Sequence, residues 1–399
     1  MSKVLMIAFE TGRWGPARLI APMTEAGFEI AVLCPAENII CKSSHVKRFF
    51  ELRELKSWRR FAKKLIAALN EWQPTFILPC DEQVIAAIHF IIRRKLAGIE
   101  IITDQHLQVL LDSIGKPEKL DAMIFKSDTH DLAIELQVKV PQSGRVNSAI
   151  KAVEIAEEIG FPVFVKKSFS WASRGTIKCQ NASEVSQAYR DLNPKTSPFK
   201  RIARHLLCRD WYPTNSATEV QKAILGVSAM FNVVAWRGQY LGGFFGSREQ
   251  TIGGNGPSTI VRLGPNAICE DSARKLVVAM GTSGFWAFDF MWDQSTNSAT
   301  LLECNPRPNQ VSHLGPNIGV DLCVALKKAC AGEDVQSVPV TQSALVPLFP
   351  QEWLRDEHSA LTQRHNLDIP KCDAKLLEFM LKEGQNKGLS VEKLNLNFA

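Results

Sequence analysis

Glu303-Cys304-Asn305-Pro306-Arg307 places a carboxylate, a carboxamide and a guanidinium close together, directly after the apolar run 299–302. Side chains two positions apart in a strand share a face, so Glu303 and Asn305 are expected to point the same way. Oxygen ligands on one face suit a hard cation such as Mg²⁺, which keeps free positions for phosphate oxygens. Arg307 is placed to make bidentate hydrogen bonds to those phosphates through its guanidinium group. The stretch therefore predicts one wall of a metal and phosphate site.

A hairpin is expected to bring a third oxygen ligand to this wall. Residues 285–292 are aromatic and extended in character, and residues 293–298 have turn chemistry. A hairpin centred on Thr296 pairs Asp289 with Glu303, and cross-strand Cβ atoms lie about 4.5–5.5 Å apart. Two facing carboxylates repel unless a cation lies between them. A surface hairpin with solvated acids is the alternative, and a slip of one residue would turn every side chain over.

The composition describes an ordinary soluble protein of two or three domains, with 45% hydrophobic and 22% charged residues. No apolar run reaches the length of about 18 residues that a membrane span needs, and the first residues lack a signal-peptide layout, so no membrane partner is expected. The ten cysteines are scattered without zinc-type spacing, which favours the cytoplasm. The net charge of +6 comes without a dense basic run, so no nucleic acid partner is expected.

Residues 1–115 alternate strand-like and helix-like patterns, which predicts a parallel sheet of Rossmann type. The strand-like runs are 4–9, 30–33, 76–78 and 100–102. Apolar residues recur at helical spacing from Trp58 to Trp72 and indicate one buried helix face. The loop 10–15 lacks Gly-x-Gly-x-x-Gly, so a dinucleotide site is not expected there. This loop either contacts substrate or is a plain turn.

Residues 116–146 are interpreted as a polar connection. A helix capped by Ser148 and closed by Gly160 follows, then a strand at 161–167, a small-residue loop at 168–175 and a strand at 176–179. Such a loop can lay backbone N–H groups over phosphates, although an ordinary hairpin has the same pattern. Residues 228–235 and 239–245 predict antiparallel strands, and residues 253–257 form either a lid or a turn. Residues 331–399 are polar, with one late amphipathic helix around 376–381.

The order of these features resembles the ATP-grasp superfamily, in particular the branch of carbamoyl-phosphate synthetase and biotin carboxylase, over residues 1–330. The resemblance implies an α/β plus α+β fold. A Rossmann-like pre-ATP-grasp domain would occupy residues 1–115, an ATP-grasp domain 116–330 and a C-terminal extension 331–399. The small lobe would span 147–218, and the large lobe 219–330 with part of the 116–146 connection. ATP is then expected between the two lobes.

The resemblance also assigns the nucleotide site. Lys126 and Lys166 correspond to the two nucleotide lysines of the family, although Phe125 stands where the family usually has Asp. Loop 168–175 corresponds to the glycine-rich phosphate loop. Residues 219–221 correspond to the hinge that meets adenine, and the acid that often binds ribose has no counterpart at 227–228. The expected nucleotide contacts are Lys126, Lys166, Ser173, Gly175, Glu219 and Gln221.

By the same resemblance, Asp289, Glu303 and Asn305 are the ligands of Mg²⁺, with Mn²⁺ as an alternative ion. Arg307 is the phosphate-contacting arginine, and Arg248 lies where the acyl phosphate often binds. The implied activity is an ATP-dependent ligase that joins a small-molecule carboxylate to an amine through an acyl phosphate. A homodimer is left open. A phosphotransferase, a non-catalytic nucleotide-binding scaffold and an ATP-independent metalloprotein are the alternatives.

Overall fold

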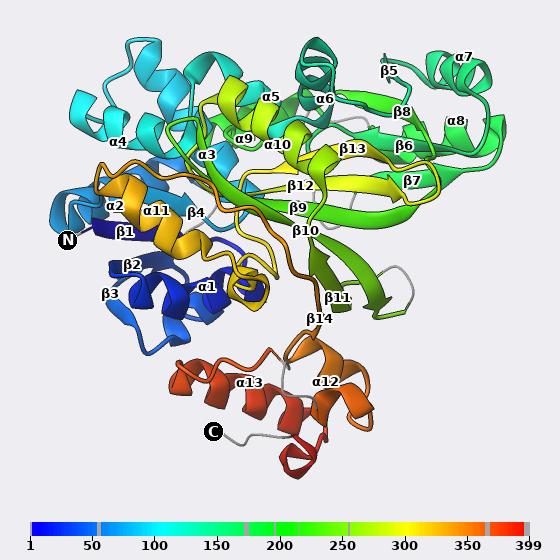
Figure 1. Cartoon of the computed structure of the whole chain (residues 1–399). Helices are drawn as coiled ribbons and strands as arrows, with labels where there is room; N and C mark the ends of the chain where they lie inside the picture. The colour runs from blue at the N-terminus through cyan, green and yellow to red at the C-terminus, as the bar shows by residue number, and fades with distance from the viewer. Residues whose placement is uncertain are drawn as a thin grey trace.

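The computed structural model of the chain describes residues 2–53, 57–170, 175–194, 197–214, 216–253, 256–363 and 368–394. Within them the chain forms three β-sheets, which Figure 1 shows with the N-terminal segments in blue and the C-terminal helices in orange and red. No described helix is both long enough and apolar enough to cross a membrane. The cysteines are all free thiols.

The N-terminal sheet is parallel, as predicted, with the strand order β3-β2-β1-β4. Its central strands are continuous apolar runs because helices cover both of its faces. Helix α2 buries the predicted apolar face, including Trp58 and Leu65. The strands are β1 (Ser2–Ile7), β2 (Phe28–Cys34), β3 (Val46–Glu51) and β4 (Phe76–Pro79), and the helices are α1 (Trp14–Glu25), α2 (Trp58–Trp72), α3 (Glu82–Leu96) and α4 (Asp104–Ile114).

The prediction of a strand at residues 100–102 is wrong, because these residues form the connection between α3 and α4. The missing strand is β3, which lies at the edge of the sheet. Its side chains are mostly half-buried or exposed, and Phe49 is 38% exposed. An edge strand of mixed polarity gives neither an apolar run nor a clean alternation, so its sequence carries little signal.

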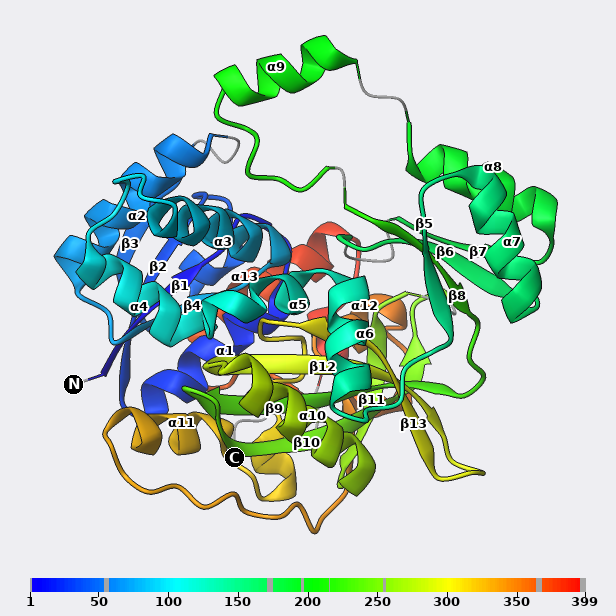
Figure 2. The ribbon, with the colours of Figure 1, turned by 90° about the horizontal axis from the view of Figure 1, so that it is seen from above.

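The second sheet is small and antiparallel, with the strand order β5-β8-β6-β7. Helices α7 and α8 pack on it around a compact apolar core, while α9 lies apart from it (Figure 2). Ser148 caps α7 as predicted, since its hydroxyl accepts from the Lys151 backbone N–H. The elements are β5 (Ser143–Val146), α7 (Ala149–Ile159), β6 (Val163–Lys167), β7 (Thr176–Cys179), α8 (Ala182–Leu192), α9 (Pro198–Leu206) and β8 (Thr218–Lys222).

The third sheet is the largest and has the strand order β13-β12-β9-β10-β11-β14, all antiparallel. Helix α10 belongs to the core on one face of this sheet and α11 to the core on the other. Both cores continue into the N-terminal sheet, which holds the two sheets together. The elements are β9 (Val227–Trp236), β10 (Gln239–Thr251), β11 (Ser258–Gly264), α10 (Ala267–Met280), β12 (Gly284–Asp293), β13 (Ser298–Asn305), α11 (Leu322–Cys330) and β14 (Ala344–Pro347).

Residues 116–146 are not a plain connection, which corrects the sequence interpretation. They contain α5 (Leu120–Ile124), α6 (Lys126–Glu135) and β5, and both helices contact β13. Their short length and mixed polarity hide the helical period in the sequence. The C-terminal segment forms α12 (Gln351–Arg355) and α13 (Ala374–Asn386), and α13 buries Leu376, Leu377 and Met380 as the amphipathic pattern predicted.

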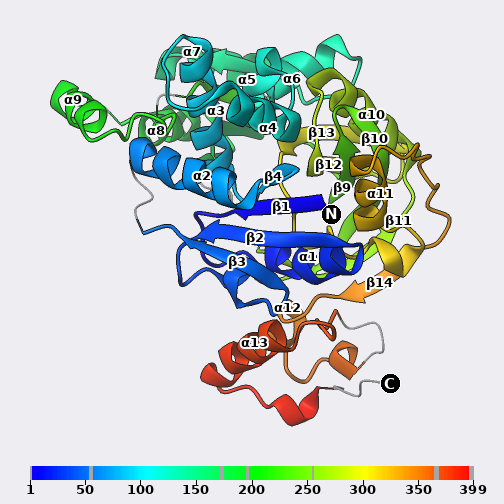
Figure 3. The ribbon, with the colours of Figure 1, turned by 90° about the vertical axis from the view of Figure 1, so that its left-hand side faces the viewer.

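A buried ion cluster ties the C-terminal segment to the rest of the molecule. Figure 1 and Figure 3 both place α12 and α13 below the N-terminal sheet. Asp368 accepts from the guanidinium of Arg18 on α1, and its Oδ1 lies 2.9 Å from His313 Nε2. The side chains of Arg18, Asp368 and His313 are only 5–6% exposed. These contacts join three segments that are distant in the sequence.

Candidate active site

The hairpin β12–β13 places Asp289 directly opposite Glu303, as predicted. Nearer the turn the register differs by one residue, since Trp292 pairs with Ala299 and not with Thr300. A bulge between the two regions leaves Leu302 without a partner in β12 and shifts the pairing. The bulge turns the strand so that the predicted carboxylate pair forms even though the turn is not centred where the sequence suggested.

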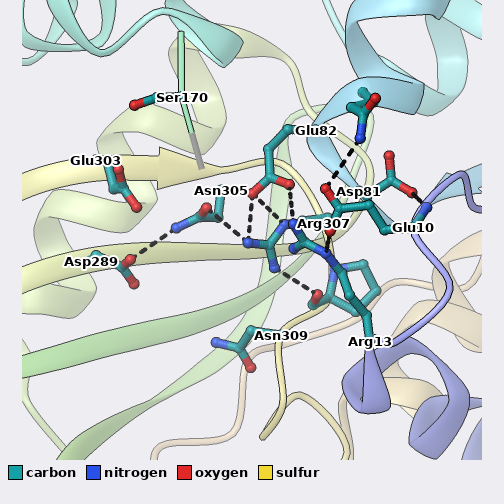
Figure 4. Close-up of polar contacts among 12 residues, drawn as sticks. Glu10, Arg13, Asp81, Glu82, Ser170, Asp289, Glu303, Asn305, Arg307 and Asn309 are labelled. Carbon is teal, nitrogen blue, oxygen red and sulfur yellow. Dashed lines mark hydrogen bonds and ion pairs between the residues drawn. The ribbon is translucent and has the colours of Figure 1, made fainter. Parts of the chain in front are cut away.

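The two carboxylates and one carboxamide meet on this wall, as Figure 4 shows. Asn305 Nδ2 donates to Asp289 Oδ2 at 3.0 Å. Burial and the neighbouring Glu303 raise the pKa of Asp289. Burial also acts to raise the pKa of Glu303, but the ammonium groups of Lys126 and Lys166 outweigh it and hold that pKa low. A bound cation would remove the repulsion between the two acids.

The donor set fits Mg²⁺. Asp289, Glu303 and Asn305 all carry side-chain oxygen atoms, which suit a hard cation, and in this structure the Asn305 amide nitrogen donates to Asp289 while its Oδ1 accepts from Arg307 at 3.3 Å. Among the described residues no group of three or more His, Cys, Asp or Glu side chains could hold a metal by itself. Two carboxylates with an amide oxygen leave coordination positions open for water and phosphate oxygens, as in magnesium sites that handle nucleotides.

Both predicted lysines reach this wall from other elements. Lys126, at the start of α6, lies with Nζ 3.1 Å from Glu303 Oε2 and donates to the Ser170 carbonyl oxygen at 2.6 Å. Lys166, on β6, donates to Gln221 Oε1. Burial lowers the pKa of Lys166, while Glu219 and Glu303 act in the opposite direction. Two cations therefore stand beside the two carboxylates, where a polyanion would bind.

The predicted hinge residues lie on β8, between β5 and β6. Glu219 is opposite Lys166 in the register, and Gln221 is opposite Phe164. Their side chains are almost fully buried, yet Glu219 Oε1 and Gln221 Nε2 have no hydrogen-bond partner. The chain passes from this strand directly into β9 of the large sheet. Strand β8 therefore joins the small sheet to the large one, and its contact with a nucleotide stays a prediction.

The predicted phosphate loop is described only in part. Ser173 lies outside the described residues. Gly175 is the first described residue after this gap. Its φ is +78°, and its carbonyl oxygen accepts from the Lys167 N–H at 2.8 Å. A Cβ at this position would lie 3.1 Å from the Ser170 Cβ, so a side chain is disfavoured by both backbone and space.

Arg307 forms an ion pair with Glu82 in this structure, and its contact with phosphate stays a prediction. Its Nε and a terminal nitrogen lie 2.8 and 2.6 Å from Glu82 Oε1 (Figure 4). The other oxygen of Glu82 accepts from Arg13 at 2.7 Å. Glu82, at the start of α3, therefore links Arg13, which directly precedes α1, to Arg307 at the end of the β13 wall. Burial acts to raise the pKa of Glu82, but the two guanidinium groups lower it overall.

Sequence reasoning missed Glu82 and two supporting residues. Asp81 accepts from the backbone N–H groups of Phe9 and Glu10, at 2.6 and 3.0 Å, and so holds the loop after β1. His130 on α6 donates through Nε2 to the carbonyl oxygen of the bulged Leu302, at 2.9 Å. The adjacent acids Asp81 and Glu82 directly after a buried strand were a signal, since strand ends in parallel sheets gather functional groups.

We predict that Glu82→Gln lowers kcat/KM of the ATP-dependent reaction that the sequence resemblance implies by about 10- to 100-fold, because Arg307 and Arg13 lose the charge that positions them. The loss should fall mainly on kcat, since the two lysines expected to bind phosphate are untouched. Steady-state ADP release measures it, with Glu71→Gln as the control, because Glu71 pairs with Arg48 in an exposed ion pair. Unchanged kinetics for Glu82→Gln would contradict the positioning role.

Arg248, on β10, lines a cavity of about 560 Å³ together with Asp289, Asn305 and Arg307. Arg248 Nε is buried without a hydrogen-bond partner, and no described carboxylate forms an ion pair with this residue. The volume falls within the range of roughly 300–1,000 Å³ that is typical of small-molecule sites. The cavity adjoins the metal wall, so an anion held at Arg248 would lie beside the expected phosphates.

Comparison with known proteins agrees with this geometry. Residues 126–202 match the family model described as "Carbamoyl-phosphate synthase L chain, ATP binding domain". A putative urea carboxylase from Emericella nidulans is 26% identical over 248 residues, covering 56% of this chain and 19% of that protein. The C-terminal section of the carbamoyl phosphate synthase large chain from Aquifex aeolicus is 24% identical over 224 residues, covering 56% and 40%. The chain thus spans less than half the length of either relative.

Two solved structures share the fold over most of the chain. The N5-carboxyaminoimidazole synthetase of Staphylococcus aureus, complexed with ADP, superposes with a TM-score of 0.60 at 14% identity, covering 86% of this chain and 81% of that one. The second is the biotin carboxylase domain of the Hydrogenobacter thermophilus 2-oxoglutarate carboxylase, solved as a dimer in complex with MgADP. It superposes with a TM-score of 0.61 at 19% identity, covering 86% of this chain and 73% of that one.

The fold and the matches together show an ATP-grasp protein, which confirms the resemblance inferred from the sequence. Residues 126–202 thus resemble the ATP-binding domain of carbamoyl-phosphate synthase, and most of the chain shares its fold with N5-carboxyaminoimidazole synthetase and biotin carboxylase.

Proposed function

We propose that this chain is an ATP-dependent ligase that activates a small-molecule carboxylate as an acyl phosphate and joins it to an amine, releasing ADP and phosphate. One observation carries the proposal. The oxygen wall of Asp289, Glu303 and Asn305 stands between two lysines on one side and a cavity with an unpaired arginine on the other. This order of groups suits a triphosphate next to a carboxylate.

The chain's residues would act by holding two anions together. Lys126 and Lys166 neutralise phosphate charge, and Arg248 holds the carboxylate in the adjoining cavity. When bound, Mg²⁺ at Asp289, Glu303 and Asn305 would offset the negative charge of the phosphates. Positioning and charge stabilisation, rather than covalent help from the protein, carry phosphoryl transfer.

The proposed reaction proceeds in two steps, phosphoryl transfer and then attack by the amine. A carboxylate oxygen attacks the γ-phosphorus of ATP, the bond to the β–γ bridging oxygen breaks, and ADP leaves. The amine nitrogen next attacks the acyl carbon, the bond from that carbon to the phosphate oxygen breaks, and the amine loses a proton. Exclusion of water from the cavity would protect the acyl phosphate from hydrolysis. The same residues would serve Mn²⁺ as an alternative ion.

Hydroxylamine tests the proposal without knowledge of the natural amine, because it converts an acyl phosphate into a hydroxamate. The protein is incubated with MgATP, hydroxylamine and a panel of carboxylates, and ADP and hydroxamate are measured together. We expect both products in equal amounts, and only when a carboxylate is present. ADP without hydroxamate would favour a phosphotransferase. If MgATP causes no thermal stabilisation, the nucleotide site itself is refuted.

Cytoplasmic localisation and a homodimer remain predictions. The Hydrogenobacter domain was solved as a dimer, and the same assembly is a candidate here. Sedimentation of the full chain would decide between monomer and dimer.

A further inference from the structure

The C-terminal segment supplies part of the cavity beside Asp289. Gln351 and Leu354 on α12 line it, together with Trp14 at the start of α1 and Ile252 directly after β10. The sequence of residues 331–399 predicted only a packing helix. Segments that lie far apart in the chain therefore enclose one space.

Packing fixes the position of α12. Strand β14 pairs antiparallel with β11, and the Leu348 N–H donates to the Thr259 carbonyl oxygen at 2.8 Å. Trp353 is fully buried and stacks on Phe349, with ring centroids 5.8 Å apart. Gln351 and Leu354 thus belong to a rigid wall and not to a free tail.

The charges in the cavity leave one place for a substrate carboxylate. Arg13 and Arg307 share the carboxylate of Glu82, and Glu10 is paired with Arg13 at 2.6 Å. Arg248 has no such partner among the described residues. A substrate carboxylate at Arg248 would lie beside Asp289, where the phosphates are expected. The remainder of the substrate must then meet the uncharged part of the lining.

That uncharged part contains a buried polar group with unused hydrogen-bonding capacity, in addition to Ser228, Asn309 and Gln310 elsewhere in the lining. Gln351 is 8% exposed, and its Oε1 is buried without a partner. No described residue bonds to its amide nitrogen either. A buried carboxamide without partners costs free energy, which a ligand group can recover. The neighbouring lining residues Leu354, Trp14 and Ile252 are apolar and offer contact without charge.

We propose that Gln351 and Leu354 are specificity-determining residues, which select a carboxylate substrate whose body is apolar and carries one uncharged hydrogen-bonding group. The inference rests on the proposed function and assigns a role to the C-terminal segment. A second charge on the substrate is selected against, because Glu10, Arg13 and Arg307 in the lining are already in ion pairs and the carboxamide cannot replace its hydration.

The test compares probes of equal length that differ only at the end remote from the carboxylate: hexanoate, adipamate, adipate and aminocaproate. Each is supplied with MgATP and hydroxylamine, and kcat/KM is taken from hydroxamate formation. Thermal stabilisation by each probe, with a non-hydrolysable ATP analogue and Mg²⁺, gives a readout that does not depend on turnover. The wild type should prefer adipamate and hexanoate to both doubly charged probes.

Gln351→Glu should lower kcat/KM for adipamate relative to aminocaproate by about 10-fold or more, because a carboxylate now favours the ammonium end. Gln351→Leu should abolish the preference for adipamate over hexanoate, and Leu354→Ala should admit bulkier carboxylates. Gln385→Glu makes the same chemical change on the exposed face of α13 and should alter nothing. MgATP should stabilise every variant equally, which shows that each one is folded.

The outcomes separate the inference from the function on which it rests. A wild type that makes hydroxamate but prefers adipate or aminocaproate overturns the inference alone. If the ratios of kcat/KM between the probes are unchanged in both Gln351 variants, the inference alone is likewise overturned. If MgATP stabilises the wild type but no carboxylate gives hydroxamate or further stabilisation, the proposed function fails, and the inference fails with it.

Discussion

Glu303→Gln should lower carboxylate-dependent ADP release by about 10²- to 10³-fold, the largest effect on activity that we expect from a single substitution. Glutamine keeps the size of the side chain but removes the charge that faces Lys126 at 3.1 Å and opposes Asp289 across the hairpin. The cation would lose one of two carboxylate ligands. The two lysines would also lose the anion that holds them.

The measurement is a coupled ADP assay with a magnesium titration, beside thermal unfolding with ATP in the presence and absence of Mg²⁺. The variant should keep the stabilisation by ATP alone and lose the increment due to magnesium. Glu270→Gln is the matched control, because Glu270 on α10 pairs with Arg274 away from the cavity. Wild-type ADP release by Glu303→Gln would show that the metal ligands were assigned wrongly.

The largest effect on stability is expected from Asp368→Asn, which should lower the free energy of unfolding by about 3 kcal/mol or more. The substitution leaves the guanidinium of Arg18 buried without its anion, and such a charge costs more than the pair contributes when intact. Urea unfolding measures the loss, and limited proteolysis should show release of the C-terminal helices. Asp334→Asn, at an exposed aspartate, is the control. Equal urea-unfolding midpoints for Asp368→Asn and Asp334→Asn would contradict the stabilising role of the buried ion cluster.

The same cluster should make the protein acid-sensitive. Burial acts to raise the pKa of Asp368, but Arg18 and His313 outweigh it and lower that pKa below its ordinary 3.8. Its contribution is present above pH 3.8 and is lost as the pH falls through the depressed value. Burial lowers the pKa of His313 below 6.5, so protonation of the unfolded chain destabilises the fold below that pH. His313→Gln should flatten the stability profile between pH 6.5 and 4.

Local patterns were sufficient for the elements that are apolar and regular. The helix from Trp58 to Trp72, the capped helix after Ser148 and the antiparallel hairpin of 285–305 were all predictable because their side-chain periods are strong. Edge strand β3 and the short helices of 116–146 were missed, since partial burial weakens the period on which such predictions rest.

The pairing of Asp289 with Glu303 was predicted from a turn centre that the hairpin does not have. The bulge at Leu302 restored it, and the sequence carries no signal for that bulge. The bulge is supported by His130, which reaches the Leu302 carbonyl oxygen from 172 residues away. Register within a hairpin can therefore depend on a contact with another element.

By itself, the sequence predicted the ligand chemistry of the proposed metal site, the two proposed nucleotide lysines and the family resemblance, because these depend on residue types and short spacings. Only the tertiary structure decided that Glu82 holds Arg307, that Arg248 stands unpaired in a cavity, and that Gln351 closes that cavity from the C-terminal segment. The physical reason is separation along the chain. Charge pairing and burial act between groups that are near in space, and no spacing rule connects residues 82, 248, 307 and 351.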